Sequence, residues 1–143
     1  MTEVEIPVPG VQPLDHTADV GIEVRAPDLR ELCLRAASGM TYLILDAPPP
    51  EVTEERRVRV EGSSPAHLLR NWLREVLYLF DGEGLVFAAG RIEELGDGNL
   101  EGIVDAGFPS GPPAREIKGV TLHGLEAREM QTEGWYARVI FDV

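Results

Sequence analysis

The chain has 143 residues, of which 43% are hydrophobic, and a formal net charge of -12 at pH 7. This size and composition are typical of one compact unit with its own core, so we expect a single domain over residues 1–143. The acid excess argues against broad binding to a nucleic-acid backbone, which needs a basic surface. It favours a cation or a basic partner protein instead.

The chain shows no sign of export or of a disulfide framework. It has neither a basic start nor an apolar leader, and no segment approaches the roughly 20 apolar residues that span a bilayer. We therefore expect a cytoplasmic protein without membrane contact. The single cysteine, Cys33, falls in a helical apolar pattern and is expected to be a buried side chain in a reducing compartment.

The first predicted elements are a strand and a helix. Residues 20–25 alternate between apolar and polar, which is typical of a half-buried strand. Asp28 and Glu31 have the spacing of a helix-capping box, and apolar residues recur at helical spacing from Leu29 to Leu43. The sequence therefore predicts a helix that begins after Asp28.

A second strand and a second helix follow a proline-rich surface connection at residues 48–50. Residues 56–61 alternate like a strand that faces water on one side. Ser64 is the expected cap of the second helix, with Pro65 in its first position. The apolar stripe that contains Trp72 lies at the spacing of an inward helix face, so we assign it to the core rather than to a partner groove.

The rest of the chain predicts strands. Asp97-Gly98 is a hairpin signal, and residues 109–113 are too rich in proline and glycine for a strand, so they are expected to form a surface loop. Two helices followed by hairpin-sized strands predict an α+β domain with the helices packed on a mainly antiparallel or mixed sheet. The expected strands cover residues 85–87, 91–95, 99–105, 116–129 and 134–143.

Carboxylates mark the ends of two predicted strands. Asp142 directly precedes Val143, whose terminal carboxylate adds a second group of hard oxygen donors, while Asp15 and Asp19 stand before the strand at residues 20–25. If the two strands are neighbours, these groups converge on a site for a divalent cation such as calcium, magnesium or manganese. Four confined carboxylates would otherwise repel one another and raise their own pKa values.

Each carboxylate also has a purely structural interpretation. Asp15 suits an Asx-type turn at the start of a strand, and Asp19 suits a solvated loop. Asp142 suits an edge-strand charge that discourages aggregation. Spacing alone leaves both interpretations open.

Three further polar residues are candidates for contact with a partner or a nucleotide. His16 and His123 lack the companions of a zinc centre; His16 is expected to orient the acidic loop, and His123 to hydrogen-bond within a strand over residues 118–126. Lys118, the only lysine, is either a solvated strand charge or a contact for a phosphate or a partner carboxylate. No phosphate-binding loop, nucleophile elbow or dinucleotide fingerprint is present, so an autonomous enzyme is not indicated.

Three motifs together resemble the archease family over the whole chain. They are LDHTADVG at residues 14–21, KGVTLHGL at residues 118–125 and GWYARVIFDV at residues 134–143. The resemblance implies an accessory protein of the RtcB-type tRNA-splicing ligase, a metal-dependent enzyme that joins a 2′,3′-cyclic phosphate or 3′-phosphate end to a 5′-hydroxyl end. Family members are understood to promote guanylylation of the ligase and so its repeated turnover.

The same resemblance implies roles for individual residues. Asp19 and Asp142 are the expected essential carboxylates, and Asp15 with the Val143 carboxylate completes the cation site. Lys118 falls at the position of a family motif and is expected to contact the ligase or its nucleotide. Two alternatives stay open: a metal-dependent phosphoesterase that uses the same carboxylates to activate water, and an RNA-binding chaperone, which the acid excess disfavours.

Overall fold

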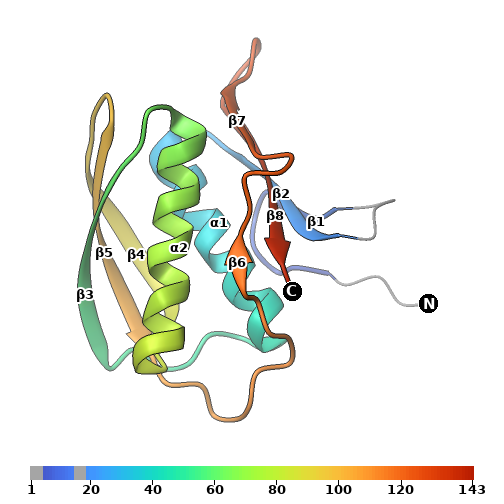
Figure 1. The fold of residues 1–143 in the computed structure, drawn as a ribbon, viewed down its shortest axis with the longest axis vertical. Coiled ribbons are helices and arrows are strands. Elements are labelled where there is room, and N and C mark those ends of the chain that lie inside the picture. Colours follow the sequence, from blue (N-terminus) through green and yellow to red (C-terminus); the bar gives the residue numbers. More distant parts are fainter. Residues whose placement is uncertain (1–4, 15–18) are drawn as a thin grey trace.

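The computed structural model describes residues 5–14 and 19–143, in which two α-helices lie between two antiparallel β-sheets (Figure 1). Both helices contact strands of both sheets, so the core occupies the two interfaces on either side of the helical layer. In chain order the elements are β1 (Val11–Pro13), β2 (Val20–Ala26), α1 (Leu29–Leu45), β3 (Glu54–Glu61), α2 (Pro65–Glu83), β4 (Val86–Leu95), β5 (Asn99–Gly107), β6 (Gly119–Val120), β7 (Glu126–Glu129) and β8 (Trp135–Asp142).

Helix α1 begins at its predicted cap. The Asp28 carboxylate accepts a hydrogen bond of 2.8 Å from the backbone N–H of Glu31, which satisfies one of the free donors of the first turn. The helix ends at Asp46, which adopts a left-handed conformation and donates its backbone N–H to the Tyr42 carbonyl at 2.7 Å. Both boundaries are therefore fixed by hydrogen bonds local to the chain.

Helix α2 also confirms its predicted start and its core stripe. Ser64 accepts from the backbone N–H of His67 at 3.2 Å, and Pro65 occupies the first turn. Trp72 is fully buried, and its indole N–H donates to the carbonyl of Cys33 on α1 at 2.9 Å. This hydrogen bond joins the two helices at the centre of the core.

The first sheet has five strands in the order β1-β2-β8-β6, and β7 also pairs with β8. Strand β8 is thus flanked by β2 on one edge and by β6 and β7 on the other, all antiparallel. Because a central strand has partners on both edges, the last residues of the chain are held in the sheet rather than frayed.

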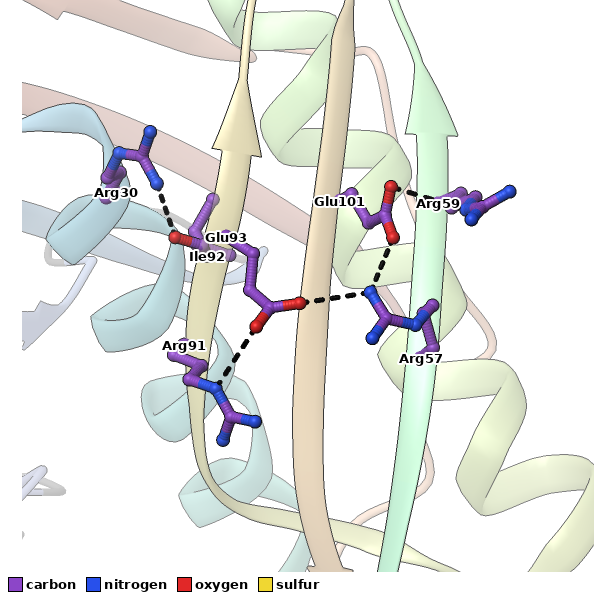
Figure 2. A network of polar contacts seen from close by, with 7 residues as sticks. All are labelled: Arg30, Arg57, Arg59, Arg91, Ile92, Glu93 and Glu101. Carbon is purple, nitrogen blue, oxygen red and sulfur yellow. Dashed lines mark hydrogen bonds and ion pairs between the residues drawn. The ribbon is translucent and has the colours of Figure 1, made fainter.

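The second sheet has the order β3-β5-β4, and a hairpin joins β4 to β5 at Asp97-Gly98 as predicted. Its outer face carries a charged network in which Arg57 pairs with Glu93 at 3.0 Å and with Glu101, while Arg91 pairs with Glu93 at 3.5 Å (Figure 2). Ile103 lies between Arg57 and Arg91 in the strand register yet is only 1% exposed. The charged side chains therefore cover an apolar residue on the solvent side of this sheet.

Several strand predictions need correction. The single strand expected over residues 116–129 is wrong, because a turn at residues 122–124 separates β6 from β7, and Gly124 has a positive φ of 65°. Residues 86–87 and 91–95 belong to one strand with bulges, β4, rather than to two, and Leu85 directly precedes that strand. Strand β1 was not expected in the proline-rich start of the chain. The α+β class is confirmed, and the strands divide between two sheets.

Most other boundaries agree with the sequence within a few residues. The loop at residues 109–113 forms no helix or strand, and Cys33 is fully buried as expected. Across residues 5–14 and 19–143, no helix combines the length and the apolar character needed to cross a bilayer.

Candidate functional site

The structure brings Asp19 and Asp142 to the same end of neighbouring strands. Strands β2 and β8 pair antiparallel with Val20 opposite Phe141, so the residue before Val20 and the residue after Phe141 stand next to each other at the end of the ladder. Opposed residues of antiparallel strands have Cβ atoms about 5 Å apart. Both aspartates are exposed to solvent, so their carboxylates are accessible from outside the protein.

Leu14 and Gly21, on either side of the segment that contains Asp15 and His16, lie next to each other at this same place. The backbone N–H of Leu14 donates to the carbonyl of Gly21 at 3.0 Å, which holds the two ends of that segment together. A methyl group on Gly21 would approach the Leu14 side chain to 2.5 Å, so glycine allows this close contact. The predicted ligand Asp15 and the predicted orienting residue His16 lie outside the described residues.

Strand β6 brings Lys118 to the other side of Asp142. The backbone N–H of Lys118 donates to the Asp142 carbonyl at 2.7 Å, and Gly119 pairs with Asp142 in the register. A Cβ atom on Gly119 would lie 3.9 Å from the Cβ of Asp142, so a larger residue there would narrow the approach to the aspartate. Lys118 is exposed. It lies at the same end of the first sheet as Asp19 and Asp142, which we call the carboxylate end.

His123 does not occupy the predicted strand, and its expected role as a strand hydrogen-bond partner is wrong. It is exposed in the turn between β6 and β7, where its carbonyl accepts a hydrogen bond of 3.4 Å from the Thr121 hydroxyl. The turn is fixed to β8, because Thr121 donates to the Ile140 carbonyl at 3.0 Å and Arg138 donates to the Gly124 carbonyl at 3.0 Å. His123 is therefore presented at the surface by an ordered turn.

The donor set at this end is chemically suited to a hard cation. Asp19 and Asp142 offer only oxygen ligands, which calcium and magnesium prefer. Within the described ranges, no group of three or more His, Cys, Asp or Glu side chains could hold a metal ion. Two described aspartates are too few for a complete shell of side chains, so a cation at this end would need further ligands.

A row of residues that sequence reasoning did not single out lies on the outer face of the same sheet. Tyr136 is flanked in the register by Arg25 and Arg128, and each guanidinium carbon lies 5.0 Å from the ring centre. The tyrosine hydroxyl donates to Glu23 at 3.1 Å, and burial is the main cause that raises the pKa of Tyr136.

This row shares a face with the candidate cation site. Tyr136 and Asp142 are six residues apart on β8, an even spacing that places both side chains on one side of the sheet. Because side chains alternate between the two faces along a strand, residues 134–143 alone were enough to predict that Tyr136 and Asp142 share a face. The flanking arginines could not be assigned in the same way, because they come from β2 and β7 and depend on the pairing of distant segments.

Comparison with known proteins finds that this chain is similar to members of one protein family. The model of the archease protein family matches residues 12–143. A curated archease from Archaeoglobus fulgidus is 36% identical over 135 residues, which cover 91% of this chain and 96% of that protein. The match therefore extends across almost all of both chains.

Solved structures agree with the sequence comparison. The solution structure of protein 1598 from Methanobacterium thermoautotrophicum is 33% identical, covers 94% of this chain and 99% of that one, and superposes with a TM-score of 0.73. A crystal structure from Thermotoga maritima, described as an archease and possible chaperone, is 20% identical, covers 92% of this chain and 96% of that one, and has a TM-score of 0.59; it supports the fold. The chain belongs to the archease protein family.

Proposed function

We propose that this protein activates an RtcB-type RNA ligase in tRNA splicing and RNA repair, acting in the cytoplasm as an accessory protein and not as an enzyme. The proposed action is to promote guanylylation of the ligase and thereby its repeated turnover. The observation that carries the proposal is the pairing of β2 with β8, which places Asp19 beside Asp142 in a member of the archease family.

The proposed site holds a divalent cation, either calcium, magnesium or manganese. Its ligands are the carboxylates of Asp15, Asp19, Asp142 and Val143. Such a cation would neutralise negative charge on phosphate oxygens at the ligase active site. Asp19 and Asp142 hold their positions through the sheet, and Gly119 leaves the approach to Asp142 open.

Three residues around the site are proposed to contact the ligase or its nucleotide. Lys118 offers a flexible positive charge that can meet a phosphate. His123 is held at the surface by the turn between β6 and β7. His16, next to Asp15 in the sequence, is proposed to orient the acidic loop.

The chemistry of the described residues suits an accessory role. The single cysteine is fully buried, and burial raises the pKa of the Cys33 thiol to about 12, so it is protonated at neutral pH. Exposed carboxylates can bind a cation or a positively charged partner without a nucleophile of their own. A surface of this kind is suited to presenting charge to another protein's active site.

The proposal is tested by measuring transfer of GMP from GTP to the ligase of the same organism, with and without this protein. Wild-type protein is expected to increase both the rate of guanylylation and the number of ligation turnovers. Asp19→Asn and Asp142→Asn keep the side-chain shape, remove the charge and are expected to lose most of the stimulation. Asp97→Asn, in the exposed hairpin between β4 and β5, is the matched control and should stimulate like wild type.

The possible results separate the candidate functions. Absence of stimulation by wild-type protein would contradict the proposal, and hydrolysis of a phosphate ester without ligase would favour the phosphoesterase alternative. If both folded site variants still stimulate the ligase, the accessory role would stand, but the carboxylates would have no part in it. Circular dichroism of each variant establishes that it is folded.

A further inference from the structure

A second surface, distinct from the carboxylate end, is formed by residues 47–52 and 108–113, which we call the proline surface. These two segments follow α1 and β5 and line a hollow of about 400 Å³ that includes Leu45 and Phe108. On the other side of Pro48 and Pro49 lies a second hollow of about 460 Å³, whose lining is mainly apolar and includes Val8 and Phe87. The two hollows share the proline segment as a common wall.

The proline surface is rigid before any partner binds. Of the 11 prolines in the chain, seven line the two hollows, and proline fixes its own φ angle. The loop after Phe108 is also tied to the end of α1: Ala114 donates to the Ile44 carbonyl at 2.8 Å, and the Arg115 guanidinium donates to the Leu43 carbonyl at 2.7 Å. A partner that binds here would lose little free energy to the ordering of this surface.

Two large apolar side chains are exposed on this surface. Phe108 is 56% exposed and Val52 is 48% exposed. Phe108 stands over the end of α2, where a Cβ atom on Gly84 would lie 3.8 Å from its ring. Exposed aromatic side chains next to a preformed hollow are typical anchors of protein interfaces.

Four carboxylates lie on the segments that lead into or out of the apolar area. Asp46 and Glu51 belong to or adjoin the first proline segment, while Asp81 and Glu116 lie near the end of α2 and the end of the second loop. Burial is the main cause that raises the pKa of Asp81, and the charge of Glu116 adds to it. None of the four forms an ion pair with the described part of the chain.

We infer that the proline surface is the docking site for a basic segment of the RNA ligase, with Phe108 inserted against an apolar side chain of that segment. An enzyme that holds RNA ends needs a positively charged surface around its active site, and unpaired carboxylates on the segments that lead into or out of an apolar hollow complement such a surface. The loop that begins at Phe108 leads to Lys118, whose backbone bonds to Asp142. This inference rests on the proposed ligase partner and adds a binding surface to it.

The test measures the Kd of this protein for the ligase together with the stimulation of guanylylation. Phe108→Lys removes the apolar anchor and adds a positive charge that a basic segment repels, so it is expected to weaken binding by at least about 10-fold. Phe108→Leu retains an apolar side chain and is expected to bind nearly as wild type does. Gln131→Lys adds the same charge in the exposed turn between β7 and β8 and serves as the control that should bind like wild type.

Salt and neutral variants test the role of the carboxylates. Binding of wild-type protein is expected to weaken as salt concentration rises, and the double variant Asp81→Asn with Glu116→Gln should show a smaller salt dependence. If wild type stimulates the ligase but Phe108→Lys binds as tightly as wild type, the docking site is wrong while the ligase partner stands. If wild type neither binds nor stimulates the ligase, the proposed function fails and this inference fails with it.

Discussion

Trp72 connects the elements of the core more than any other single side chain described above. Its indole bonds to Cys33 on α1, its ring meets Phe87 edge-on at a centroid distance of 6.4 Å, and it packs on β5 where Gly102 leaves room. A Cβ atom on Gly102 would approach the Trp72 ring to 2.9 Å. The residue therefore links both helices to the second sheet.

Replacing Trp72 with phenylalanine removes the hydrogen bond to Cys33 and leaves a cavity. We expect Trp72→Phe to lower the free energy of unfolding by about 1 to 3 kcal/mol. Urea unfolding followed by circular dichroism measures this change. A variant with an unchanged midpoint would show that the indole is not an important contact of the core.

Cys33 is expected to be chemically inert in the folded protein. Its thiol is fully buried, and its pKa of about 12 leaves almost no reactive thiolate at pH 8. Iodoacetamide should therefore modify Cys33 only after unfolding, as mass spectrometry would detect. Rapid modification of the native protein, at the rate found in urea, would contradict the buried position.

Gly21 provides a test of how the acidic loop is held. A methyl group there would approach the Val139 carbonyl and the Leu14 side chain to 2.5 Å each, so Gly21→Ala must displace either strand β8 or the start of the loop. We expect a lower melting temperature and reduced stimulation of the ligase. In the matched control, Gly82→Ala meets nothing within 4 Å and adds helix propensity to α2, so its stability should be unchanged or higher. Equal behaviour of the two variants would contradict this account.

At the scale of elements, the outer face of the second sheet depends on ionised side chains. Hydrogen bonds from Arg57 are the main cause that lowers the pKa of Glu101, and Arg59 contributes a further attraction at 3.3 Å. A carboxylate with a lowered folded pKa stabilises the protein above its unfolded pKa, and this stabilisation is lost as pH falls toward the folded value.

Glu101→Gln should therefore unfold at a lower temperature than wild type at pH 7. The difference should shrink as pH falls below about 4, where the glutamate of the unfolded chain is itself protonated. Thermal melts of both proteins at several pH values make the comparison. A difference that stays constant with pH would indicate that packing over Ile103, and not charge, determines the effect.

The sequence predicted elements whose causes are local. Both helix starts follow from caps within a few residues, at Asp28 and Ser64, and the hairpin at Asp97-Gly98 follows from its own two residues. The break between β6 and β7 was missed because apolar residues continue through it, while the turn depends on the conformation of Gly124 and on its contact with β8. Local patterns also carry no information on how strands divide between two sheets.

At the scale of the whole molecule, the candidate site combines both ends of the sequence. The strand composition of residues 20–25 and 134–143 placed Asp19 and Asp142 at strand ends, but only the pairing of β2 with β8 places those ends together. Long-range pairing is not encoded in spacing, which is why the residue pattern alone left the structural interpretations open. The position of the carboxylates is now described, and their binding of a cation stays a prediction.

The carboxylate end and the proline surface are proposed to have different functions in one accessory protein. In the proposed function, the carboxylate end would act on the nucleotide chemistry, and the proline surface would provide affinity for the ligase. Variants of the proline surface should therefore be rescued by a higher concentration of this protein, whereas variants of Asp19 or Asp142 should not. Titration of each variant in the guanylylation assay distinguishes the two effects.

We propose that Asp19 and Asp142 act as one site, and a double-mutant cycle on ligase guanylylation tests this proposal. The rate is measured at saturating concentrations of wild type, Asp19→Asn, Asp142→Asn and the double variant. Residues that serve one site are strongly non-additive, so each single variant should lose nearly as much stimulation as the double variant. Independent, additive losses, or stimulation that survives in the folded double variant, would contradict the proposal.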